Sequence, residues 1–229
     1  MRFFRPGKHG KARENSVELV RLRRAMGEPR CPICRLVRES EEWRLWLLLY
    51  EHSGDPEIHR RFARALGLCS RHAKILERIV VQRPLATPAA VARFYGPLCA
   101  HVRGALGDGL PRQRCDLCRY AEDTARRYAA SLAELLRSAE GRREYERSDG
   151  LCIPHLAHAM DAATGGVRDF LRADTAARLA TLEGNLRELQ RKQRYDVREG
   201  LTPAEANAWR EALWRLGGVE FDDLIAGMP

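Results

Sequence analysis

The chain has no long apolar segment. Of its 229 residues 31% are charged and only 7% are aromatic. The longest dense apolar stretch, Trp43 to Tyr50, is far shorter than the roughly 20 residues that cross a bilayer as a helix. The basic sequence MRFFRPGKHGK is not followed by the apolar run of roughly 7 to 15 residues that a secretory signal needs. We therefore expect a cytoplasmic protein with no membrane segment.

Signatures of common enzymes are also missing. The sequence has no phosphate-binding glycine loop, no nucleophile elbow and no HExxH motif. Carboxylates such as Glu39, Glu41 and Glu42 lie on an arginine-rich helical stretch, where we expect solvated ion-pair partners rather than acid or base catalysts. The sequence favours a protein that is not an enzyme.

Positive charge is concentrated near the N-terminus. The formal net charge is +9, and residues 1–30 contain nine Arg and Lys against three Glu. The rest of the chain holds 31 basic and 28 acidic residues, so it is close to neutral. We predict that residues 1–14 form a flexible basic arm that contacts a protein or a nucleic acid. The alternative is a tail that only aids solubility.

Six of the seven cysteines belong to a motif that occurs twice. The first copy reads CPIC at 31–34 and GLCSRH at 67–72, and the second reads CDLC at 115–118 and GLCIPH at 150–155. The CxxC pairs are offset by 84 residues and the CxxH pairs by 83, and Phe62 aligns with Tyr145. Self-similarity at a nearly constant offset indicates an internal duplication.

The segments around these motifs have helical patterns and no strand signals. Apolar residues recur at helical spacing between the ligands of each copy. We predict helices over about 15–26, 57–66 and 167–194, and a capping box at Leu201–Glu205 opens a last helix that carries Trp209 and Trp214. We expect these two tryptophans to pack on the core.

The predicted fold class is therefore all-α, with two internally duplicated, metal-stapled helical units packed together, a long amphipathic helix and a C-terminal helix. The expected segments are the arm at 1–14, the first helix and first repeat at 15–110, the second repeat with the long helix at 111–195, and the C-terminal helix and tail at 196–229.

The motif pairs have the spacing of metal ligands. CxxC places two thiolates at the first turn of a helix, CxxH adds a third thiolate and an imidazole, and tetrahedral Cys₃His is a closed zinc site. The pairs are separated by 34 and 33 residues, which we read as a helix out and a return within each repeat. The first predicted zinc site is Cys31, Cys34, Cys69 and His72, and the second is Cys115, Cys118, Cys152 and His155.

Other uses of the same cysteines remain open. Cys₃His can ligate an iron–sulfur cluster, and CPIC resembles the motif of dithiol redox proteins. Simple burial of the cysteines would leave the repeat and the histidines unexplained. A c-type haem is disfavoured, because Arg35 and Arg119 follow the CxxC motifs where histidine is needed. We expect Cys99 to be a small buried residue and His158 an ordinary histidine.

The duplicated motifs resemble those of an uncharacterised family of bacterial proteins with paired CPxC and GLCxxH motifs, described as a domain of unknown function. The resemblance covers about residues 15–216, including the sequence RKQRYDVREG and the helix around Trp209. It implies a shared helical fold and metal binding but no established activity. The sequence thus predicts a zinc-binding scaffold with two ions that acts as an interaction or regulatory module. The alternative is an iron–sulfur or dithiol redox protein or sensor.

Overall fold

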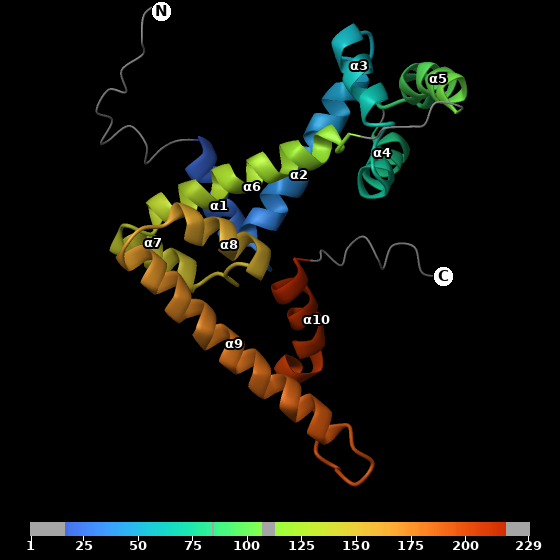
Figure 1. The fold of residues 1–229 in the computed structure, drawn as a ribbon. Coiled ribbons are helices and arrows are strands. Elements are labelled where there is room, and N and C mark those ends of the chain that lie inside the picture. The colour runs from blue at the N-terminus through green and yellow to red at the C-terminus, as the bar shows by residue number, and fades with distance from the viewer. Residues whose placement is uncertain (1–16, 84, 107–112, 219–229) are drawn as a thin grey trace, which may run out of the picture. The chain divides into compact units, whose positions relative to one another are not determined.

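The computed structural model describes residues 17–83, 85–106 and 113–218, and in these ranges it contains ten α-helices and no strand (Figure 1). The all-α prediction is confirmed. The helices are α1 Val17–Met26, α2 Pro32–Tyr50, α3 Pro56–Arg64, α4 Ser70–Gln82, α5 Pro88–Ala105, α6 Asp116–Leu135, α7 Ala139–Glu146, α8 Ile153–Ala162, α9 Gly166–Lys192 and α10 Pro203–Gly217. None of these helices is both long and apolar enough to cross a membrane. The predicted basic arm at 1–14 lies outside the described residues.

The chain divides into two compact units. The terminal unit combines the residues up to Leu36 with those from Ala125 onward, and the inserted unit comprises Val37–Thr124. Helices α2 and α6 each contribute residues to both units. The units therefore cut across the two sequence repeats.

Local sequence signals set the helix starts. The Asp55 carboxylate accepts hydrogen bonds from the backbone N–H groups of Glu57 and Ile58, at 2.8 and 3.4 Å, and Pro56 occupies the first helical position of α3. At α10 the Thr202 hydroxyl accepts from the Glu205 N–H, and the Glu205 carboxylate accepts from the Thr202 N–H. The predicted capping box is present.

The inserted unit has a hydrophobic core between α2, α3, α4, α5 and the start of α6. Helix α3 packs on α5, where the Phe62 ring lies 5.4 Å from the Phe94 ring and 5.1 Å from the Tyr95 ring. The buried residues of this core are Leu45, Leu49, Phe62, Ile75, Leu76, Ile79, Ala86, Ala90, Phe94, Leu98, Cys115 and Leu117.

In the terminal unit α10 folds back along the 27-residue helix α9 and also contacts α8 (Figure 1). Lys192 donates to both carboxylate oxygens of Glu205 at 2.9 Å, which ties the end of α9 to the start of α10. Trp214 is buried as predicted. The prediction was wrong for Trp209, which is exposed and lies beneath the Arg210 guanidinium, because it lines an open hollow beside Leu186 and Leu189 of α9.

Candidate metal centres

All four motifs stand at the start of a helix. Cys31 and Cys115 immediately precede α2 and α6, while Cys69 and Cys152 are the N-cap residues of α4 and α8. The two N-cap cysteines have almost the same backbone angles, φ −71° and ψ 165° against φ −73° and ψ 156°. The positive end of a helix dipole favours thiolates, so the local geometry suits cation binding in both repeats.

The eight predicted ligands gather into two clusters, and within each cluster one ligand atom per residue lies within 4.8 Å of the others. Cluster A belongs to the terminal unit and cluster B to the inserted unit. Cluster A is Cys31, Cys34, Cys152 and His155, and cluster B is Cys69, His72, Cys115 and Cys118. The predicted grouping within each repeat was therefore wrong. Each cluster takes its CxxC from one repeat and its CxxH from the other.

The lengths of the helices explain the exchange. With a rise of about 1.5 Å per residue, the 19-residue helix α2 spans about 28 Å and the nine-residue helix α3 only about 14 Å. In the second repeat the 20-residue helix α6 spans about 30 Å and the eight-residue helix α7 about 12 Å. The return helix is too short to bring a CxxH motif back to its own CxxC. The prediction was that a helix out and a return would bring the two motifs of one repeat together.

Cluster A has the size of a single tetrahedral site. His155 Nδ1 lies 3.2 Å from the sulfurs of Cys34 and Cys152 and 3.5 Å from that of Cys31, and the Cys34 and Cys152 sulfurs are 3.6 Å apart. Zn–S bonds of about 2.3 Å and Zn–N bonds of about 2.0 Å would put tetrahedral ligand atoms roughly 3.5–3.8 Å apart. The residues present therefore fit one zinc ion.

Cluster B has the same donor set and similar dimensions. His72 Nδ1 lies 3.1 Å from the Cys69 sulfur and 3.6 Å from those of Cys115 and Cys118. The sulfurs of Cys69 and Cys118 are 3.6 Å apart. Both histidines thus turn Nδ1 toward the sulfurs, which leaves Nε2 for a different partner.

For His72 that partner is Glu41. The distance from His72 Nε2 to Glu41 Oε1 is 2.8 Å, and both side chains are completely buried. Arg71 donates to both oxygens of the same carboxylate at 2.6 and 2.7 Å. A carboxylate on the outer nitrogen fixes the tautomer and orientation of a metal-binding imidazole. The expectation that Glu41 is a solvated ion-pair partner was wrong.

The sequence does carry a signal for Glu41. Positions 37, 41, 45 and 49 of α2 form one buried stripe with a spacing of four residues. Val37, Leu45 and Leu49 are its apolar members, and Glu41 is the second residue of the series. A carboxylate at a core position of a helix requires a buried partner.

The side chains of cluster B shift the pKa values of one another in opposite directions. Burial raises the pKa of Cys115, but hydrogen bonds from His72 and from backbone N–H groups outweigh it and lower the value to about 6. Burial lowers the pKa of His72, but hydrogen bonds with Cys115 and Glu41 raise it to about 10. The surroundings favour the Cys115 thiolate, which is the form that binds a metal, whereas His72 must release its Nδ1 proton when a metal binds.

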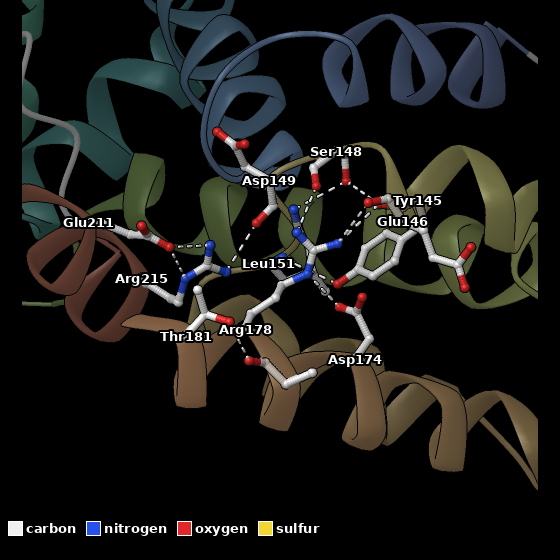
Figure 2. A network of polar contacts seen from close by, with 12 residues as sticks. Tyr145, Glu146, Ser148, Asp149, Leu151, Asp174, Arg178, Thr181, Glu211 and Arg215 are labelled. Atoms are coloured by element: carbon white, nitrogen blue, oxygen red, sulfur yellow. Dashed lines mark hydrogen bonds and ion pairs between the residues drawn. The ribbon is translucent and has the colours of Figure 1, made fainter. Parts of the chain in front are cut away.

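In the terminal unit, arginines from α9 and α10 hold the turn that leads into Cys152 (Figure 2). Arg178 donates to the carbonyl oxygens of Ser148 and Glu146, at 2.7 and 3.3 Å, and is anchored by Asp174 at 2.7 Å. Arg215 donates to the carbonyl oxygen of Asp149 at 3.0 Å. Two arginine side chains therefore fix the turn by donating hydrogen bonds to its backbone carbonyl oxygens.

The two motifs of cluster A are also joined to each other and covered. The backbone N–H of Arg30, next to Cys31, donates to the Asp149 carboxylate at 2.6 Å. The carbonyl oxygen of Gly218, at the end of α10, lies 4.0 Å from the Cys34 sulfur. The end of α10 thus closes one side of cluster A.

The matching turn of the inserted unit is held by apolar packing. Gly67 has φ +80° and its α-carbon faces the side chains of Leu98, Tyr95 and Phe62. Gly150 has φ +75° at the corresponding position, and there the neighbour is the Arg178 side chain. The same glycine turn is therefore supported by apolar side chains in one unit and by an arginine in the other.

Two further candidate side chains stand outside the clusters. Cys99 is exposed on α5, so the expectation that it is buried was wrong: it lies on the outer side of a helix that buries Phe94 and Leu98. The His158 ring lies 6.3 Å from the His155 ring and belongs to neither cluster.

No protein-family model, curated protein sequence or solved structure matches this chain.

Proposed function

We propose that the protein is a zinc-binding, non-catalytic helical scaffold in which each cluster holds one ion and fixes one compact unit. The observation that carries this proposal is the pair of separate Cys₃His sets, each within 4.8 Å and each built at helix starts. Four protein ligands complete a tetrahedral shell. Catalytic zinc requires an open coordination position for a substrate or a reactive water, and no such position is then left.

The compactness of the clusters supports a single ion over an iron–sulfur cluster. A multi-iron cluster places a core of several atoms between its ligands, so it needs cysteine sulfurs that are farther apart than the 3.6 Å seen in each cluster. The donor set points the same way, because Cys₃His is common for structural zinc and Cys₄ is usual for iron–sulfur clusters.

The role proposed for the scaffold is to present a surface to a protein or nucleic-acid partner. The concentration of positive charge in residues 1–30 supports a polyanionic partner. Deleting residues 1–13 is expected to weaken binding to a single-stranded oligonucleotide and to reduce the salt dependence of that binding. An unchanged salt slope would contradict a role for the arm.

The metal is tested by elemental analysis and a visible spectrum on protein purified without added metal and without oxygen. Two zinc ions per chain and no colour are expected. Iron with inorganic sulfide and a brown solution would support the redox alternative. A well-folded chain without metal would contradict both readings.

A further inference from the structure

The inserted unit contains a pocket beside cluster B that the metal sites do not explain. Its volume is about 560 Å³, which is within the range of roughly 300–1,000 Å³ typical of small-molecule sites. Its apolar lining includes Leu48, Ile58, Phe62, Leu68 and Leu117. The pocket therefore offers an apolar surface on which a planar ring of a ligand can pack.

The charged side chains that line the pocket are mostly basic. Four arginines line it, together with two carboxylates, those of Asp116 and Asp123. The arginines are Arg44, Arg61, Arg64 and Arg119. Because the pocket has more guanidinium groups than carboxylates, it favours an anion.

Nearby carboxylates satisfy these arginines only in part, although Arg64 pairs with Glu57 at 3.5 Å. Asp116 is shared, with the Arg61 Nε 3.7 Å from one of its oxygens and Arg119 bound to the other. The Arg61 Nε is buried and makes no hydrogen bond. The guanidinium carbon of Arg44 lies 5.7 Å from the centre of the Tyr120 ring. The Arg61 Nε therefore has donor capacity left for a ligand oxygen.

We propose that this pocket binds a nucleotide, either free or at the phosphorylated end of an oligonucleotide. A guanidinium binds phosphate oxygens through two parallel hydrogen bonds, so the arginines would take the phosphate. The base would lie on the apolar lining, where the Tyr120 ring offers a stacking surface.

Two walls of the pocket are the segments that carry the ligands of cluster B. Gly67 and Leu68 immediately precede Cys69, and Asp116 and Leu117 lie between Cys115 and Cys118. An ion in cluster B would hold these segments together and so fix the width of the pocket. Nucleotide binding goes beyond the scaffold function and does not depend on which metal fills the cluster.

The experiment is calorimetric titration of AMP and of a short 5′-phosphorylated oligonucleotide into the full chain with its native metal, at low and moderate salt. Saturable binding of one AMP per chain is expected, with weaker binding of adenosine and of inorganic phosphate. Arg44→Gln is expected to weaken AMP binding roughly tenfold, the effect of losing one charge-assisted contact. Asp123→Asn is expected to tighten it, because it removes a negative charge from the pocket.

Arg187→Gln is the matched control, since it removes the same charge from an exposed arginine of α9 that is paired with Glu183. AMP binding is expected to be unchanged in this variant. Helicity and metal content, measured on every variant, confirm folding, and Arg61→Gln provides a second pocket variant. Tighter binding of the 5′-phosphorylated oligonucleotide than of the same oligonucleotide without that phosphate would identify the end of a nucleic acid as the ligand, and tighter binding of AMP than of either oligonucleotide a free nucleotide. No saturable binding, or equal losses in Arg44→Gln and Arg187→Gln, would overturn the proposal.

Discussion

Clusters A and B contain the same set of three cysteines and one histidine, but different members of the set are buried. In cluster A the thiols of Cys31 and Cys152 are buried, while His155 is partly exposed. In cluster B the histidine is buried, while Cys69 and Cys118 are partly exposed. The duplication thus supplied two equal ligand sets, and the surrounding helices decided which ligand is shielded from solvent.

The supporting residues also differ. His72 has the buried carboxylate of Glu41 on its outer nitrogen, and the residue that corresponds to Glu41 in the second repeat is Ala125. Among the described residues, His155 Nε2 has no hydrogen-bond partner of this kind. Cluster A relies instead on arginines from α9 and α10, a pair of helices that follows only the second repeat. We therefore expect cluster B to hold metal through its histidine and cluster A through its helical cover.

The largest expected effect comes from removing ligands in pairs. Cys31→Ser with Cys152→Ser removes two ligands from cluster A and should leave one zinc per chain. Cys31→Ser with Cys69→Ser damages both clusters and should leave none. A structural zinc is worth on the order of 10 to 16 kcal/mol, so each unit that loses its ion should unfold. Zinc analysis and hydrogen exchange resolved by unit measure both outcomes, and one retained zinc in the Cys31/Cys69 variant would show pairing within repeats.

Glu41→Gln tests the carboxylate that only cluster B has. We expect its zinc affinity to fall roughly 10- to 100-fold, because the amide lacks the charge that strengthens the His72 ligand and balances Arg71. Competition with a chelator measures the two affinities separately, and cluster A should be unchanged. Glu42→Gln is the control, since Glu42 is paired with Arg38 and Arg83 and lies outside both clusters. Equal zinc affinities of cluster B in Glu41→Gln and Glu42→Gln would contradict a role for Glu41 in metal binding.

Gly150→Ala tests the arginine-supported turn of cluster A. The added β-carbon would lie 3.0 Å from the Arg178 Nε, and the alanine would have to keep a backbone φ of +75°. Strain of this kind costs about 1–3 kcal/mol, so the terminal unit should melt at a lower temperature. Gly184→Ala is the matched control, because it adds the same atom inside α9 with nothing within 4 Å. It should stabilise α9 by up to about 1 kcal/mol, and similar melting of both variants would argue against a special role for the turn.

Thr202→Ala gives the smallest expected effect. It removes half of the capping box of α10 and should destabilise that helix by about 1 kcal/mol. Because the end of α10 closes one side of cluster A, zinc should leave cluster A faster while its release from cluster B stays the same. Stopped-flow release into a colorimetric chelator measures the two rates. A faster release from cluster B would contradict the separate covers.

Local signals in the sequence were sufficient for the all-α class, for the starts of α3 and α10, and for the eight residues of the clusters. Asp55 with Pro56, and Thr202 with Glu205, mark helix starts by bonds within one turn, so no distant residue is needed to predict them. The CxxC and CxxH motifs likewise place their own pairs at helix starts.

The tertiary structure decided how these pieces combine. Which CxxC meets which CxxH depends on the unequal lengths of α2 and α3 and of α6 and α7, a property of the whole helical path rather than of any motif. The burial of Glu41 and the exposure of Cys99 and Trp209 depend on which helix faces are covered by neighbours. The sequence therefore determined which residues supply the ligands of both sites. Packing between segments distant in the chain determined which motifs meet, because contacts between distant segments have no fixed spacing in the sequence.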